Sequence, residues 1–283
     1  MLLRAAHWWE TICGSGSMCL PLNTKGTAMR HDVRDASRDS MSFSSQLSAS
    51  YRHDAGLRRL AWVAWTALAM LLTGCASETL FQSAFNSNTI GQPPAAMQAV
   101  GTVKVSGAPG SVVIVGPVPN SKENWVRISR AVGAEVPITT MDGIFSQFKG
   151  DGSYGFLAAL FIPSGSGLAT VEFDTTPGGS PPSTGFLHLD FLQNNTIRIN
   201  DNPALTFGTF PRDQFFTLSV GLEISASSAV AHMALFGTGT SGTFDFTIPQ
   251  LNLARQYGGI RLWMGFPWSG SFSATDIIVT RKK

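Results

Sequence analysis

The ten residues from Phe215 to Ile224 alternate strictly between apolar and polar side chains after the first. The even positions from Phe216 to Ile224 are all apolar, whereas positions 217, 219, 221 and 223 are Thr, Ser, Gly and Glu. A period of two residues sends successive side chains to opposite faces of a strand. The segment therefore predicts an antiparallel β-strand with one face in the core and the other in water.

Similar short segments recur from about residue 99 to the end of the chain. They are rich in apolar and β-branched residues and are separated by turn signals such as Pro163-Ser164-Gly165 and Asn194-Asn195. No segment beyond residue 98 keeps a helical period for three turns. Residues 99–283 are therefore predicted to form one all-β antiparallel sandwich or barrel. The predicted strands are residues 100–105, 111–115, 124–130, 154–162, 168–174, 185–192, 196–200, 215–224, 230–236, 242–248, 259–265 and 272–280.

The sequence before this domain has the layout of a secretory signal. Residues 60–72 are apolar and uncharged, follow Arg58-Arg59 and lead into small residues. A membrane-spanning helix needs about 20 apolar residues, so this segment is too short to be one. A buried core helix could have this length. We interpret residues 57–74 as a signal peptide, and residues 1–56 as a leader, or a start assigned too far upstream, that takes no part in the fold.

The end of this segment, Leu72-Thr73-Gly74-Cys75, resembles the lipobox of bacterial lipoproteins. The resemblance implies cleavage between Gly74 and Cys75 and attachment of a diacylglycerol to the Cys75 thiol. Ala76, rather than Asp, follows the cysteine, which in Gram-negative members of this family implies transfer to the outer membrane. The protein would then face the periplasm or the exterior. The other cysteines, Cys13 and Cys19, precede the cleavage point, so the mature chain cannot form an internal disulfide.

Residues 75–98 are predicted to be a lipidated tether. They are rich in Ser, Asn, Gln and Ala, contain Pro93-Pro94, and place their few apolar residues without a steady period, which is typical of a flexible linker. From Cys75 onward the chain carries twelve Lys and Arg residues against thirteen Asp and Glu residues. This nearly neutral balance gives nucleic acid no basic surface to bind, so nucleic-acid partners are not expected.

The last two predicted strands resemble the closing strands of concanavalin A-like jelly rolls, a family that includes legume lectins, laminin G-like domains and many bacterial glycan-binding domains. Residues 260–265 lead through the Pro-Trp-Ser-Gly turn at 267–270 into a final strand that contains Asp-Ile-Ile-Val at 276–279. Residues 124–129 fit an opening strand. The resemblance covers about residues 120–283 and implies a jelly-roll sandwich, with glycan binding as one expected activity.

Glu172 and Asp174 are the carboxylates whose spacing is most relevant to catalysis. As residues i and i+2 of a predicted strand they share one face, and retaining glycosidases use two carboxylates about 5 Å apart. The glucanases of the concanavalin A-like family place a further Glu on this strand, where the present chain has Thr176 or Pro177. We therefore expect a solvated strand face and a non-catalytic protein. A glycoside hydrolase would need a second carboxylate from a distant strand.

Metal and cofactor chemistry has little support in the sequence. His188 and His232 are the two histidines after residue 75, and each lies within a predicted strand. Asp190, Asn194, Asn195 and Asp201 could supply oxygen ligands to Ca²⁺, but Asn and Asp are also the usual residues of turns. We expect no metal ion and no cofactor.

Two classes of function remain, an envelope lipoprotein with a structural or interaction role and a glycan-binding module. Trp263, Trp268, Tyr257 and Phe266 lie close together in the sequence, and exposed aromatic rings can stack on sugars. Trp268 is expected to be exposed in its turn. The alternative places Trp263 in the core and Trp268 over the end of the sandwich. The candidate ligand-binding residues are Trp268, Trp263, Tyr257, Glu172 and Asp174.

Substitution of Cys75→Ala tests the lipoprotein interpretation. In a Gram-negative host, we expect the wild-type chain to fractionate with membranes and to carry the additional mass of the lipid. The variant should lack that mass and leave the membrane fraction, because it has no thiol to acylate. A wild-type chain that is soluble and unmodified would contradict the interpretation.

Overall fold

The computed structural model describes residues 77–176, 185–238 and 243–282. The predicted signal peptide and Cys75 lie outside these residues. No helix in the described ranges is long and apolar enough to cross a membrane. The elements are β1 (Ser77–Ser83), β2 (Thr102–Ser106), β3 (Val112–Val115), β4 (Trp125–Arg130), β5 (Ile138–Lys149), β6 (Gly152–Phe161), β7 (Ala169–Asp174), β8 (Gly185–Phe191), β9 (Thr196–Ile199), β10 (Asn202–Thr209), β11 (Phe215–Ile224), β12 (Ala229–Phe236), β13 (Thr243–Thr247), α3 (Leu251–Ala254), β14 (Tyr257–Gly265) and β15 (Gly270–Lys282).

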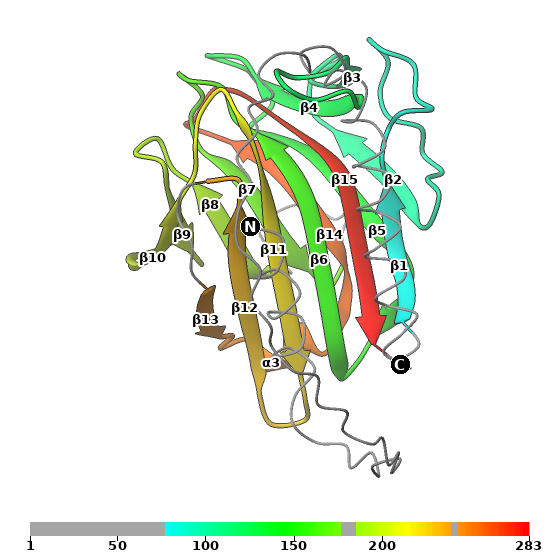
Figure 1. Ribbon diagram of the computed structural model, residues 1–283, viewed down its shortest axis with the longest axis vertical. Coiled ribbons are helices and arrows are strands. Elements are labelled where there is room, and N and C mark those ends of the chain that lie inside the picture. The colour runs from blue at the N-terminus through cyan, green and yellow to red at the C-terminus, as the bar shows by residue number, and fades with distance from the viewer. Residues whose placement is uncertain (1–76, 177–184, 239–242, 283) are drawn as a thin grey trace, which may run out of the picture. The chain divides into compact units, whose positions relative to one another are not determined.

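The strands form two antiparallel sheets that pack face to face (Figure 1). Sheet A has the order β13-β12-β11-β6-β15-β4-β3, with β1 also paired to β15, and sheet B has the order β10-β9-β8-β7-β14-β5-β2. The predicted all-β antiparallel sandwich is therefore confirmed. Strand β15 accommodates both β4 and β1 because its first part, Gly270 to Ala274, pairs with β4 and its last part, Ile277 to Lys282, pairs with β1.

The core between the sheets follows the predicted alternation. In β11 the even-numbered side chains from Phe216 to Ile224 are all buried, as the sequence indicated. On the facing sheet, Ile260, Leu262 and Met264 of β14 are buried in the same core. Burial of alternate residues on both sheets leaves the remaining residues of β14, among them Arg261 and Trp263, on the outer face of sheet B.

The prediction of a flexible tether over residues 75–98 is wrong for the part that the structure describes. Residues 77–83 form β1, which pairs with the last part of β15, and the Phe81 side chain is 0% exposed. A register shift between Thr79 and Phe81 interrupts the alternation, so both Leu80 and Phe81 are buried and no period of two is visible in the sequence. Residues up to 98 continue along the domain, with Met97 bridged to Thr102.

Two further strands were not predicted. Strand β5 contains Asp142 and Gly143, which weaken the apolar signal, although a Cβ on Gly143 would lie only 3.0 Å from the Phe81 ring. Strand β10 contains Pro203 and lies at the edge of sheet B, which is where a strand tolerates proline. Each strand contains a residue that is unusual in strands and is accommodated here by its position: Gly143 faces the Phe81 ring, and Pro203 lies in an edge strand.

Substitution of Phe81→Ala distinguishes a core strand from a tether. We expect the free energy of unfolding to fall by about 3 to 5 kcal/mol, because a large buried aromatic side chain is removed. In the same segment Ile90 is 58% exposed, and we expect Ile90→Ala to change stability by no more than about 0.5 kcal/mol. Urea denaturation of both variants measures the difference. Equal, negligible effects would mean that residues 77–98 are not part of the folded core.

Candidate functional site

A row of ionisable side chains crosses the outer face of sheet B. The strand register pairs Asp142 of β5 with Arg261 of β14, Arg261 with Glu172 of β7, and Glu172 with His188 of β8. Because paired residues on adjacent strands point to the same face, these four side chains come together although the sequence separates them widely. Their core-facing neighbours on the same strands, such as Val171 and Leu262, are fully buried.

Three carboxylates surround the Arg261 guanidinium. Its Nε donates to Asp142 Oδ1 at 2.7 Å, and its Nη1 lies 3.4 Å from Asp174 Oδ2 and 3.8 Å from Glu172 Oε1. We call Asp142, Glu172, Asp174 and Arg261 the carboxylate cluster. The contacts of Glu172 and Asp174 with one nitrogen confirm that the two carboxylates share a face. The expected solvated face is wrong, because Glu172 is 1% and Asp174 0% exposed.

In the carboxylate cluster, burial and ion pairing shift the pKa values in opposite directions. Burial raises the pKa of Asp142 and of Glu172, although Arg261 lowers both and His188 also lowers that of Glu172. Burial disfavours the charged form of Arg261, but its carboxylate neighbours outweigh this effect and its pKa is raised. The guanidinium thus stays charged, while Glu172 and Asp142 hold protons at higher pH than exposed carboxyls do.

Trp263 lies beside this cluster on the same outer face. Its indole Nε1 donates to Glu172 Oε2 at 2.8 Å, and its ring lies over Gly265, where a Cβ would be 2.7 Å from Trp263 Cζ3. The side chain is half-buried. The alternative prediction that Trp263 packs in the core is therefore wrong, since Leu262 and Met264 on either side of it take the core positions.

A second polar row continues from Trp263 across β7, β8 and β9. Trp263 pairs with Thr170, Thr170 with Asp190, and Asp190 with Arg198. Thr170 Oγ1 donates to Asp190 Oδ1 at 2.7 Å, and Arg198 donates to Asp190 Oδ2 from Nε and Nη2 at 3.1 and 2.9 Å. Arg198 Nη2 also donates to Asp201 at 2.9 Å. Burial raises the pKa of Asp190.

This arrangement explains the two aspartates that the sequence offered as Ca²⁺ ligands. Asp190 and Asp201 both bind the guanidinium of Arg198, which occupies the place of a cation between them. Across the described residues, no group of three or more His, Cys, Asp or Glu side chains is placed to hold a metal ion.

Glu172 and His188 lie next to each other on this face. Glu172 Oε1 and His188 Nε2 are 3.8 Å apart, buried, and without a hydrogen-bond partner among the described residues. A Cβ on Gly185 would lie 2.4 Å from the first atom and 2.3 Å from the second, so any other residue at position 185 would require the two side chains to shift.

Two of the predicted aromatic residues are not in the positions that the sequence indicated. Tyr257 is 0% exposed, and its ring packs against Phe145, Tyr154 and Phe186 in the core, so its assignment as a surface ligand-binding residue is wrong. It begins β14 and occupies a core position there, which a tyrosine in a short apolar segment does not reveal.

Trp268 is half-buried rather than openly exposed. Its backbone N–H donates to the Gly265 carbonyl at 3.0 Å, and its own carbonyl accepts from Arg130 Nη1 at 2.8 Å. Arg130 also donates to the carbonyls of Ala134 and Val136, so it ties residues 131–137 to residues 266–269. The exposed aromatic side chain of this turn is Phe266, at 77%.

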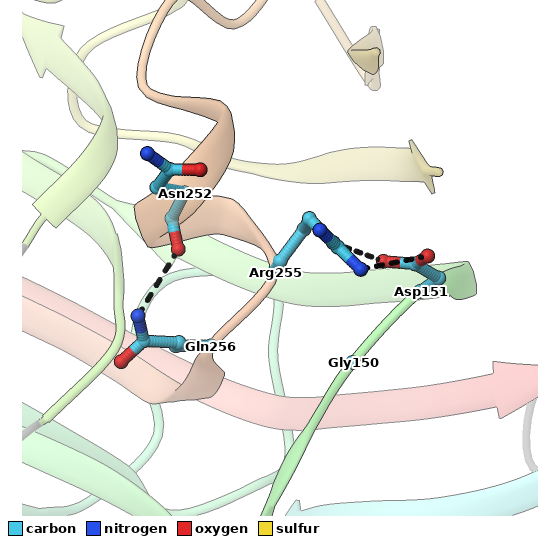
Figure 2. A pocket seen from close by; sticks show the side chains of 5 residues that line it. All are labelled: Gly150, Asp151, Asn252, Arg255 and Gln256. Carbon is cyan, nitrogen blue, oxygen red and sulfur yellow. Dashed lines mark hydrogen bonds and ion pairs between the residues drawn. The ribbon is translucent and has the colours of Figure 1, made fainter. Parts of the chain in front are cut away.

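A pocket lies apart from the two polar rows of sheet B, at the point where β5 ends, β6 begins and α3 leads into β14 (Figure 2). It is lined by Gly150, Asp151, Asn252, Arg255 and Gln256. Arg255 forms an ion pair with Asp151, with Nε 2.6 Å from Oδ1, and Gln256 Nε2 donates to the Asn252 carbonyl at 3.3 Å. None of the residues predicted from the sequence lines this pocket.

The sequence missed Asp142, Arg261 and Arg198, which complete the two polar rows. The period of two that defines β14 already places Arg261 on the same face as Trp263, so this residue could have been found. Asp142 and Arg198 could not, because their proximity depends on the order of the strands in sheet B.

No protein-family model and no curated protein matches the chain. Similar solved structures include a carbohydrate esterase from the Shiga toxin-encoding bacteriophage phi24B, with a TM-score of 0.49, 11% identity, and coverage of 74% of this chain and 100% of that chain. Arcelin-5, a lectin-like defense protein from Phaseolus vulgaris, has a TM-score of 0.43 and 8% identity, covering 74% and 98%. Basic winged bean lectin with Tn-antigen has a TM-score of 0.43 and 12% identity, covering 74% and 98%.

The pH dependence of stability tests the state of Glu172. Its pKa in the folded chain is raised above the ordinary value of 4.5, so the protonated form favours folding. This contribution is present below pH 4.5 and is lost as pH rises through the folded pKa. We expect the urea midpoint of wild type to fall from pH 4.5 toward neutrality, and to fall less in Glu172→Gln.

The matched control is Glu135→Gln, which makes the same change at an exposed loop residue and should retain the wild-type profile. Identical profiles for wild type and Glu172→Gln would show that the Glu172 carboxyl titrates alike in the folded and unfolded chains.

Proposed function

We propose that the outer face of sheet B binds carbohydrate without hydrolysing it, and that the chain displays this face in the cell envelope from a lipid on Cys75. The observation that carries the binding role is the half-buried ring of Trp263, held on the outer face by Glu172 and continuous with the row Thr170, Asp190 and Arg198. Aromatic surface flanked by a few fixed polar groups is the usual composition of a small-molecule site.

The fixed position of Trp263 favours binding. The 2.8 Å hydrogen bond to Glu172 and the close approach to Gly265 limit the ring to one orientation. A side chain that is already ordered loses little conformational entropy when a ligand stacks on it. The half-buried Arg198 and the exposed Asp201 add donors and acceptors further along the face, and sugar hydroxyls can bind to both kinds of group.

The geometry of the carboxylates supports binding rather than hydrolysis. A general acid or a nucleophile must touch the glycosidic bond, whereas Glu172 and Asp174 are buried and both lie against Arg261. The positions at which glucanases of the concanavalin A-like family carry their further Glu correspond to Thr176 and Pro177 in this chain. The three carboxylates are better suited to fixing Trp263 and Arg261 than to proton transfer.

The start of the fold is compatible with lipid attachment. Strand β1 begins at Ser77, so cleavage before Cys75 would remove none of the strands in the described part of the chain. Beyond this agreement, the proposal of an outer-membrane lipoprotein rests on the sequence Leu72-Thr73-Gly74-Cys75 and on Ala76.

Substitution of Trp263→Ala tests the binding face. We expect the full chain, purified in detergent, to co-sediment with at least one of three insoluble polysaccharides, a β-glucan, chitin or peptidoglycan. Loss of the stacking ring should weaken that binding about tenfold or more, as removal of a central aromatic contact usually does.

Phe236→Ala is the matched control, because Phe236 is an exposed aromatic residue at 43% on the outer face of sheet A. It should bind as wild type does. Circular dichroism of each variant checks that the fold is retained. Equal binding by wild type and a folded Trp263→Ala variant, or binding to none of the three polymers, would contradict the proposed role of this face.

A further inference from the structure

The chain leaves almost no distance between the proposed lipid and the folded domain. Only Ala76 separates Cys75 from Ser77, the first residue of β1. An extended chain advances at most about 3.6 Å per residue, so the link from a lipid-bearing Cys75 to Ser77 could span no more than about 7 Å between Cα atoms. A lipid on Cys75 would therefore hold the sandwich directly by the end at which β1 starts.

Several elements are tied together at this end. Ser77 pairs with Lys282 at the end of β15, and Glu78 binds Lys149 at the end of β5, with Lys149 Nζ 3.0 Å from Glu78 Oε1. Arg281 Nη2 donates to the Asp151 carbonyl at 2.7 Å. Helix α3 and both ends of the chain's described part lie at this end in Figure 1. We call this surface the β1 end; it comprises residues 77–78, 149–152, 252–256 and 281–282.

We propose that the β1 end is a membrane-contact surface that lies against the headgroups of an anionic phospholipid bilayer. The proposal rests on lipid attachment at Cys75, which is part of the proposed function. Charge supports the same partner, because Lys149 and Arg255 pair with the two carboxylates Glu78 and Asp151 at the β1 end, and Arg281 and Lys282 leave an excess of two cations there. A basic side chain near an anionic bilayer contributes favourably to binding.

The pocket of Figure 2 opens at this end. It presents Arg255, whose side chain is 43% exposed despite its ion pair with Asp151, together with the polar side chains of Asn252 and Gln256. Guanidinium and amide N–H groups are donors to phosphate oxygens. A phospholipid headgroup thus finds both charge and hydrogen-bond donors where the short link to Cys75 would bring the bilayer.

This contact fixes the orientation of the rest of the domain. Strand β15 runs thirteen residues from the β1 end to the turn that contains Phe266, about 40 Å for an extended strand. Trp263 lies six residues along β14 from Tyr257, which pairs with Lys149 at the β1 end, about 20 Å along the strand. The carbohydrate-binding face would then lie perpendicular to the plane of the bilayer. The loop that contains Val132 would lie at the end of the domain away from the bilayer.

Site-specific fluorescence in vesicles tests this orientation. Cleavage before Cys75 removes Cys13 and Cys19, and acylation blocks Cys75, so an introduced cysteine is the one free thiol of the mature chain. We would label Asn252→Cys at the β1 end and Val132→Cys in the opposite loop, both exposed in the structure. Each full, lipidated chain is reconstituted into vesicles of phosphatidylethanolamine and phosphatidylglycerol that carry a headgroup-linked quencher.

We expect several-fold stronger quenching of the label at position 252 than at position 132. On the Asn252→Cys background, Lys282→Glu should reduce the quenching, whereas Arg127→Glu, an exposed cation of β4 outside the β1 end, should not. Equal quenching at positions 252 and 132 in a chain whose intact mass includes the lipid would overturn the orientation alone. An intact mass without lipid would overturn the proposed anchoring, and the orientation with it.

Discussion

A buried guanidinium at the centre of sheet B holds three strands in register. Arg261 of β14 binds Asp142 of β5 on one side and lies against Glu172 and Asp174 of β7 on the other. Removing one partner from a buried ion pair typically costs about 3 to 5 kcal/mol, because the remaining charge is left without compensation. Any arrangement of these strands that separated Arg261 from its carboxylates would carry that cost, so the pairing favours one register of the sheet.

The same contacts extend to the surface. Glu172 lies against Arg261 through Oε1 and accepts the indole hydrogen of Trp263 through Oε2, so the position of the half-buried ring depends on the buried charges. Burial raises the pKa of Glu172 and of Asp142 despite the nearby guanidinium, which means that desolvation exceeds the gain from pairing. Apolar residues of similar volume often stabilise a protein as much as a buried ion pair or more. The charged form of Glu172 is thus disfavoured by burial, yet this carboxyl orients the tryptophan on which the proposed binding depends.

The sequence predicted most strands because their alternation is visible locally. It failed where structure breaks that alternation: the shift between Thr79 and Phe81 hid β1, and Gly143 hid part of β5. It placed Glu172 and Asp174 on one face, since their spacing alone determines this. It could not bring Asp142 to Arg261, residues more than a hundred positions apart, because that contact follows from β5 lying next to β14 in sheet B. Tyr257 was misplaced because a tyrosine suits either a core or a surface position.

Strand β1 would connect a lipid anchor on Cys75 to the folded domain. A lipid on Cys75 would transmit any force on the domain to Ser77, and β1 passes it to β15 through the ladder of backbone hydrogen bonds between them. A short edge strand would separate easily if that ladder were its only attachment. Phe81 supplies a second one, because its ring fills the space left by the missing side chains of Gly101 and Gly143, where added Cβ atoms would lie 2.8 and 3.0 Å from it. The residues that make β1 hard to recognise in the sequence are thus those that secure the start of the domain.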